Sequence, residues 1–79
     1  MSGTVLVIDD EKNIRRTLRM VLEGEGMTVR DVERAEDARG MIADGDVDVV
    51  VCDVRLPGIS GIELLQWARK HPTAAAVPF

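Results

Sequence analysis

The sequence predicts an α/β fold in which three parallel strands alternate with three helices. Apolar runs rich in β-branched residues indicate strands over residues 4–8, 27–32 and 47–52. A segment with apolar residues at helical spacing follows each run. Strands that alternate with helices are typical of a parallel sheet with right-handed crossover connections. The 79 residues are enough for one small domain, and no repeat or linker divides them.

The first strand, over residues 4–8, is apolar and ends at Asp9 and Asp10. The next segment is predicted to be a helix from its apolar residues at helical spacing, which are Ile14, Leu18, Val21 and Leu22. Three arginines on its other faces are interpreted as a solvated surface: Arg15, Arg16 and Arg19. Gly24 and Gly26 are expected to end this helix, because glycine adopts the left-handed conformation common at helix C-termini.

The second strand–helix unit gives a weaker signal. Residues 27–32 are interpreted as a strand, and the helix after it is predicted from Ala35, Ala38, Met41 and Ile42. Gly40 lies inside that helix, where glycine is less favourable than alanine by about 1 kcal/mol.

The third strand, over residues 47–52, is almost continuously apolar, which suits a strand covered on both faces. Residues 53–61 are expected to form a loop, and Ser60 with Glu63 matches the capping box of a helix start. The helix is then predicted from Ile62, Leu65, Ala68 and Arg69, and it ends near His71 and Pro72. The Val-Pro-Phe of residues 77–79 is a candidate start of another strand.

Composition excludes several classes of function for this chain. A net charge of −4 and a pI of about 4.8 argue against direct contact with nucleic acid or an anionic membrane. The single cysteine, Cys52, rules out an internal disulfide and is interpreted as a small core residue. The first residues lack the features of a signal peptide, and no apolar run reaches the ~18 residues of a membrane span. We therefore expect a cytoplasmic protein.

Three acids follow the two strands that matter most for binding. In a sheet ordered 2-1-3, ligands bind between the carboxyl ends of the first and third strands, where the strand order reverses. Asp9 and Asp10 follow the first strand, and Asp53 follows the third. Because neighbouring strands lie ~4.8 Å apart, the three carboxylates are expected to share one small pocket.

Such a pocket predicts a cation. Two like charges ~4 Å apart repel by about 4 kcal/mol at an effective dielectric constant of 20. Mg²⁺ prefers oxygen ligands and would relieve this repulsion. A carboxylate beside the ion can attack phosphorus and form an acyl phosphate, so Asp53 is a candidate phosphoryl acceptor. Two simpler interpretations stand beside this one: Asp10 as the N-cap of the following helix, and Asp53 as a turn opener.

The pattern Val-Leu-Val-Ile-Asp9-Asp10-Glu11, with Asp53, Leu56-Pro57-Gly58 and Gly61 after an apolar strand, resembles the receiver domain of bacterial two-component response regulators. The resemblance implies a flavodoxin-like doubly wound parallel sheet. It implies that Asp53 accepts phosphate from a phosphohistidine on a sensor histidine kinase. It also implies that Asp10 binds Mg²⁺ directly, that Asp9 acts largely through water, and that Arg55 contributes its backbone carbonyl.

The chain departs from that family in length. Receiver domains have five strand–helix units, whereas this sequence has three and a candidate start of a fourth strand. Residues 1–79 are therefore interpreted as the amino-terminal part of a receiver, truncated to about three units and lacking the last two. The family's hydroxyl residue and lysine, which contact the phosphoryl group, would lie beyond Phe79, so the fragment alone is expected to be impaired. The third strand would be an open sheet edge, which favours self-association.

Two other functions compete with a phosphoacceptor domain, which is a signalling domain rather than an enzyme. A Mg²⁺-dependent phosphohydrolase with an aspartyl nucleophile is disfavoured, because such enzymes commonly carry an acid two residues after the nucleophile and Arg55 stands there. An interaction-only module would keep the fold without phosphorylation.

Overall fold

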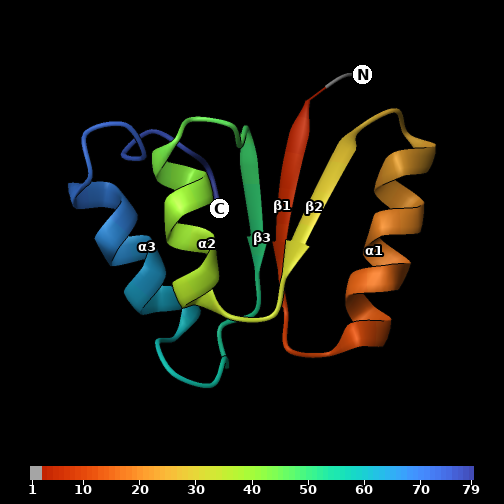
Figure 1. Cartoon of the computed structure of the whole chain (residues 1–79), viewed down its shortest axis with the longest axis horizontal. Coiled ribbons are helices and arrows are strands. Elements are labelled where there is room, and N and C mark those ends of the chain that lie inside the picture. The colour runs from red at the N-terminus through yellow and green to blue at the C-terminus, as the bar shows by residue number, and fades with distance from the viewer. Residues whose placement is uncertain (1–2) are drawn as a thin grey trace.

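Three parallel strands form one sheet in the order β2-β1-β3. They are β1 (Thr4–Ile8), β2 (Thr28–Val32) and β3 (Val49–Cys52), and they alternate with α1 (Lys12–Gly24), α2 (Ala35–Ala43) and α3 (Gly61–Lys70). The computed structural model describes residues 3–79. Helix α1 covers one face of the sheet, and α2 and α3 cover the other (Figure 1). The predicted fold class and strand order are confirmed.

Strands β2 and β3 are shorter than the sequence predicts. Residue 27 belongs to the turn after α1, because its N–H donates to the Leu22 carbonyl at 3.1 Å. Gly26 has a φ of 87°, the left-handed conformation expected of a glycine at the end of this helix. Before β3, Val47 is buried, yet it lies outside the ladder, which begins at the pair Val5 and Val49. Burial therefore extends beyond the observed strand, which is why the apolar run predicts a strand that is too long.

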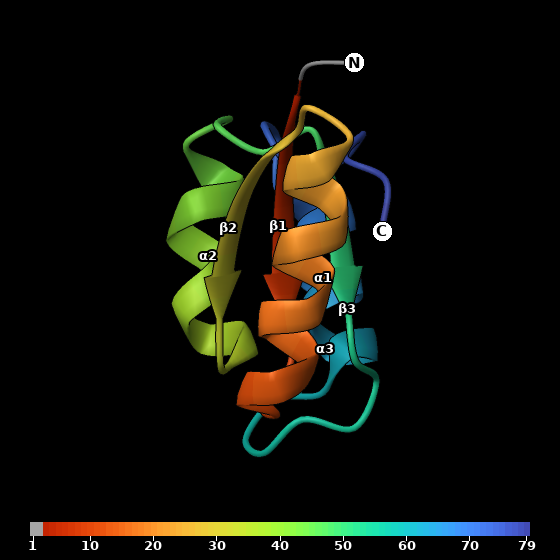
Figure 2. The ribbon, with the colours of Figure 1, turned by 90° about the vertical axis from the view of Figure 1, so that its right-hand side faces the viewer.

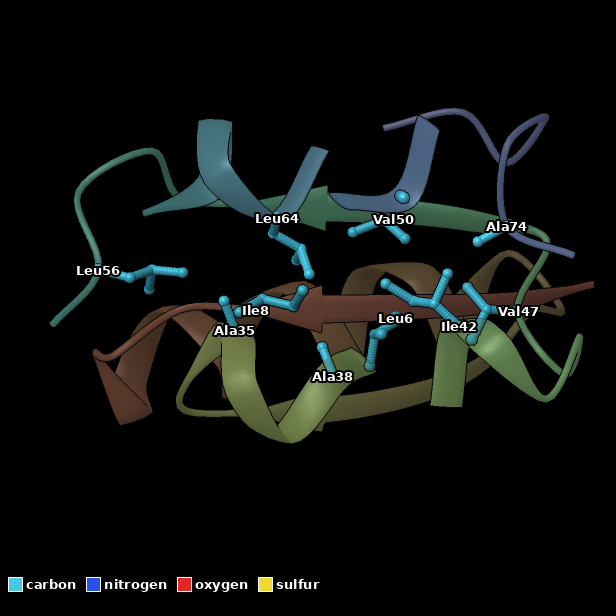
Figure 3. Close-up of a cluster of buried hydrophobic side chains, with 11 residues drawn as sticks. Leu6, Ile8, Ala35, Ala38, Ile42, Val47, Val50, Leu56, Leu64 and Ala74 are labelled. Carbon is cyan, nitrogen blue, oxygen red and sulfur yellow. The ribbon is translucent and has the colours of Figure 1, made fainter. Parts of the chain in front are cut away.

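The larger part of the core lies between the sheet and helices α2 and α3 (Figure 3). The sheet contributes Leu6, Ile8 and Val50, all fully buried. Helix α2 packs against them through Ala35, Ala38 and Ile42, and α3 through Leu64 and Ala68. The small alanine side chains let both helices approach the sheet closely.

The buried face of α3 differs from the predicted one. Its buried residues are Gly61, Leu64 and Ala68, whereas Ile62 is 53% exposed and Leu65 is only partly buried. These three positions share one helical face, but Gly61 carries no apolar side chain to reveal it. The sequence therefore predicts the helix correctly and its rotation wrongly.

The opposite face of the sheet is less completely covered. Val5, Val7 and Val29 form a small cluster with the partly buried Leu18 and Leu22 of α1. Helix α1 lies in front of the sheet in the view from its side (Figure 2) and makes its main contacts with β1 and β2. None of its own residues is fully buried.

Strand β3 is not covered on both faces, contrary to the prediction from its continuous apolar run. Val51 is 42% exposed on β3, and Val21 is 58% exposed on α1. The reason is that α1 makes its main contacts with β1 and β2: on this face of β3, Val49 packs against the cluster under α1, whereas Val51 is left exposed.

The tail runs beside β3 without forming a fourth strand within residues 3–79. The Val50 N–H donates to the Pro78 carbonyl at 2.8 Å. The guanidinium of Arg69 donates to the carbonyls of Ala75 and Val77 at 2.8 and 2.9 Å. The candidate strand at residues 77–79 is therefore present only as a single backbone bond to β3. In the same range of residues, no helix has the length and apolar character that crossing a membrane requires.

Candidate functional site

Asp9 is fixed in place at the carboxyl end of β1. It is 8% exposed, and its N–H donates to the Val32 carbonyl of β2 at 3.2 Å. Its own carbonyl accepts a 2.7 Å hydrogen bond from Arg15 Nη1, and its Oδ1 accepts one of 2.8 Å from the Glu11 N–H. Within residues 3–79 its Oδ2 makes no hydrogen bond, so this oxygen is available to a ligand.

Asp53 occupies the equivalent place at the end of β3. Its N–H donates to the Ile8 carbonyl at 2.9 Å, which extends the β1–β3 ladder by one bond. Its Oδ1 accepts a 3.0 Å hydrogen bond from the Arg55 N–H. Asp53 therefore does open a turn, as the simpler interpretation holds. That role uses only one carboxylate oxygen and leaves Oδ2 for chemistry.

Asp10 does not cap helix α1. The N-cap residue is Glu11, and no side chain caps the helix there. The Asp10 side chain is exposed and makes no hydrogen bond to the rest of residues 3–79. The capping interpretation of Asp10 is wrong, and its carboxylate is free to bind a ligand.

The structure brings the three acids together, as expected from the positions of their strands. Asp9, Asp10 and Asp53 each offer a carboxylate oxygen, and these oxygens all lie within 4.8 Å of one another. At such separations each like-charged pair repels by on the order of 3 kcal/mol at an effective dielectric constant of 20. The donor set consists only of oxygens and is partly open to solvent, which fits Mg²⁺, an ion that keeps several waters.

A glycine permits the loop after β3 to fold back closely. A Cβ on Gly61 would lie 2.6 Å from the Asp53 carbonyl oxygen and 3.2 Å from Val54 Cα. The predicted capping box follows directly: Ser60 Oγ accepts from the Glu63 N–H, and Glu63 Oε1 accepts from the Ser60 N–H. The start of α3 therefore packs closely against the backbone of Asp53, and the Gly61 N–H donates to the Val54 carbonyl at 3.2 Å.

The neighbouring Cys52 thiol lies beside the backbone of Asp53. Its Sγ donates to the Asp53 carbonyl at 3.2 Å and packs beside the core. Burial, with smaller contributions from the charges of Asp53 and Asp9, raises the pKa of Cys52 to about 11. The thiol stays protonated at neutral pH, which agrees with its interpretation as a core residue.

The arginines of α1 do not form a uniformly solvated face. Arg19 donates to Asp31 Oδ2 through Nε and Nη2, and Arg15 Nε lies 3.7 Å from Asp31 Oδ1. The hydrogen bond to Asp31 raises the pKa of Arg19 above its ordinary value. Only Arg16 is exposed as predicted. The sequence shows no pattern linking Asp31 to α1, because the contact depends on how the helix lies across β2.

The side chains of two further residues singled out in the sequence, Arg55 and His71, make no hydrogen bond to the three acids within residues 3–79. The Arg55 side chain is exposed and its N–H binds Asp53; a role for its carbonyl as a metal ligand stays a prediction. His71 ends α3, where its ring lies 5.0 Å from that of Trp67 and its Nδ1 lies 3.1 Å from Thr73 Oγ1.

Comparison with known proteins shows which family and which relatives are similar to this chain. Residues 5–79 match the model of the response regulator receiver domain family. The chain is 33% identical over 75 residues to the transcriptional regulatory protein GltR of Pseudomonas aeruginosa, covering 95% of this chain and 31% of that protein. It therefore spans about a third of the length of that curated relative.

Solved structures of response regulators share the fold of this chain. A response regulator chain from Chloroflexus aurantiacus superposes with a TM-score of 0.92 at 36% identity, over 99% of this chain and 64% of that one. TrrA of Thermotoga maritima, in complex with Mg²⁺ and BeF, gives 0.83 at 38% identity, over 89% and 61%. A second TrrA structure, in complex with the histidine kinase ThkA, gives 0.80 at 40% identity, over 86% and 59%.

Proposed function

Because the chain belongs to the response regulator receiver domain family, we propose that it is a phosphoacceptor part of a two-component phosphorelay, with Asp53 as the acceptor. The observation that carries the proposal is the convergence of Asp9, Asp10 and Asp53 at the carboxyl ends of β1 and β3. Under this proposal the donor is a phosphohistidine on a sensor histidine kinase. The complex of TrrA with ThkA supports a partner of that class.

The proposed reaction uses the free oxygen of Asp53. A lone pair on Oδ2 forms the new O–P bond, and the P–N bond of the phosphohistidine breaks. The bonding pair returns to the imidazole nitrogen, and the product on this chain is an acyl phosphate. The Arg55 N–H holds Oδ1, so Oδ2, which makes no hydrogen bond within residues 3–79, is the oxygen proposed to attack.

We further propose that the acidic pocket holds Mg²⁺. Asp10 and Asp53 would bind the ion directly, Asp9 largely through water, and Arg55 through its backbone carbonyl. The bound ion would neutralise charge on the oxygens of the transferring phosphoryl group. The oxygen-only donor set supports this assignment, and the Mg²⁺ complex of TrrA points the same way.

The chain is proposed to be the amino-terminal part of a cytoplasmic receiver that signals rather than catalyses turnover. Its match to 64% of the Chloroflexus chain supports a partial domain. The hydroxyl and lysine that contact the phosphoryl group in the family would belong to residues beyond 79. Among residues 3–79, neither a hydroxyl nor a lysine side chain hydrogen-bonds to the three acids. That observation keeps an interaction-only module as the second candidate.

Self-association through the edge of β3 is also proposed. An apolar hollow of about 220 Å³ lies next to that edge, lined by Cys52, Val54, Gly61, Ile62, Leu65 and Phe79. Together with the exposed Val51, it offers apolar surface that a second copy would cover.

Phosphorylation by a small donor tests the main proposal. The chain is incubated with acetyl phosphate and Mg²⁺, and its intact mass is measured. A phosphoryl adduct, formed slowly as expected of an impaired fragment, is expected in the wild type and in the control Asp46→Asn, an exposed acid outside the pocket, but not in Asp53→Asn. Omitting Mg²⁺ should abolish the adduct. Rapid release of phosphate without a lasting adduct would indicate a phosphohydrolase, and no reaction would favour the interaction-only module.

A further inference from the structure

Arg15 links helix α1 to the backbone of the acidic pocket. Its Nη1 donates a 2.7 Å hydrogen bond to the carbonyl of Asp9, which lies in the loop between β1 and α1. Its side chain is only 16% exposed. A charged donor to a carbonyl in a partly buried place forms a stronger bond than a neutral donor does.

Asp31 holds Arg15 in that position. It lies on β2 directly opposite Val7 of β1, two residues before Asp9. Arg19 occupies Oδ2 of Asp31 through two donors at 3.1 and 2.8 Å, and Oδ1 faces Arg15 Nε at 3.7 Å. The carboxylate of Asp31 therefore orients two arginines, of which only Arg15 reaches the pocket.

The Asp9 peptide is consequently held from several directions. The N–H of Asp9 is bound to β2, its carbonyl to Arg15, and its Oδ1 to the N–H of Glu11. The loss of the Arg15 bond would free the carbonyl and let the turn carrying Asp9 and Asp10 rotate. We propose that Arg15, oriented by Asp31, is a positioning residue that sets the Mg²⁺ affinity of the pocket. This inference rests on the proposed metal role of the three acids.

Loss of the Arg15 charge and loss of its hydrogen bond should change the Mg²⁺ affinity in opposite directions, so the two effects can be told apart. Removal of a nearby positive charge should strengthen the binding of a dication, because a repulsion is lost. Loss of a group that orients a metal ligand should weaken binding, on the order of tenfold. Arg15→Gln removes both the positive charge and the guanidinium that binds the Asp9 carbonyl, whereas Arg16→Gln on the exposed face removes a charge alone.

The experiment measures the Kd for Mg²⁺ by calorimetric titration of the 79-residue chain and its variants. We expect Arg15→Gln to weaken binding about tenfold, Arg15→Lys to give an intermediate value, and Arg16→Gln to bind as tightly as the wild type or more tightly. If Arg15→Gln binds as tightly as Arg16→Gln, the proposal is overturned. A thermal melt of each variant shows whether it is folded at the temperature of the titration.

A readout that needs no metal separates this proposal from the proposed function. The Glu11 N–H donates to Asp9 Oδ1, so its hydrogen exchange reports the order of this turn. Exchange at Glu11, relative to the amides of β1, should become faster in Arg15→Gln and stay unchanged in Arg16→Gln. If the wild type binds no Mg²⁺, the proposed metal role fails, and faster exchange in Arg15→Gln alone still supports positioning. Unchanged exchange in Arg15→Gln overturns the positioning role in either case.

Discussion

The two faces of the sheet differ in how completely they are covered. On the side of α2 and α3, Leu6, Ile8 and Val50 are fully buried among side chains from both helices. On the side of α1, the cluster around Val7 is smaller, and Val51 remains 42% exposed. The first face supplies most of the packing that stabilises the chain. The second leaves apolar surface for another contact, while the acids lie at the carboxyl ends of β1 and β3.

Truncation of Leu64 should have the largest effect on stability. Leu64 is fully buried in the better-packed face, and Leu→Ala changes at such sites cost about 2–5 kcal/mol of unfolding free energy. Leu65→Ala is the matched control on the same helix, because Leu65 is only partly buried. Urea denaturation followed by circular dichroism measures both. Equal losses from the two variants would contradict the assigned rotation of α3.

The next largest effect is expected at Gly61. A Cβ there would lie 2.6 Å from a backbone oxygen that cannot easily move, so Gly61→Ala should destabilise the chain by about 1–3 kcal/mol. Gly40→Ala provides the opposite control. It lies inside α2 with nothing within 4 Å of the added Cβ, and it should stabilise the chain by up to about 1 kcal/mol. Thermal melts of the two variants should shift in opposite directions.

A polar substitution at Val51, on the α1 side of β3, should change the unfolding free energy little and self-association more. Val51→Thr places a hydroxyl at a largely exposed position, so the unfolding free energy should change by less than about 1 kcal/mol. If a second copy covers this surface, sedimentation equilibrium should show weaker self-association in Val51→Thr than in the wild type. An unchanged association constant would place the contact elsewhere.

Near neutral pH the smallest effect is that of Cys52, because its influence on stability appears only as the pH rises. Its pKa in the folded chain is about 11, above the ordinary value of 9.0, because burial disfavours the thiolate. The unfolded chain therefore loses its thiol proton first as the pH rises, and stability should fall between about pH 9 and pH 11. Iodoacetamide should accordingly alkylate Cys52 much more slowly in the folded chain at pH 8 than in urea. Equal alkylation rates would contradict the burial of the thiol.

The alternation of strands and helices could be predicted because it depends on periodicity within each segment. The meeting of Asp9, Asp10 and Asp53 followed from the rule for parallel sheets, since both strands end at the same edge. The burial of Leu64 could not be predicted, because the face it shares with Gly61 and Ala68 includes a residue without a side chain.

Contacts between elements distant in sequence explain the other differences. Arg15 and Arg19 were interpreted as solvated because nothing near them in the sequence indicates Asp31, twelve residues beyond Arg19. Likewise, the exposure of Val51 depends on where α1 lies, which the apolar run of β3 does not specify. Local patterns define the elements, and the way those elements pack decides which side chains meet.

Proline in the tail has a consequence for the edge of β3. In a parallel pair, a residue that accepts from one strand position normally also donates to a carbonyl two residues earlier. Pro78 accepts from the Val50 N–H but has no N–H to return, so the carbonyl of Asp48 gains no bond from it. The tail thus protects the edge through one hydrogen bond and not a ladder. To detach, the tail would lose that bond, the two that Arg69 makes, and the packing of Ala74 and Val77 against the core under α2 and α3.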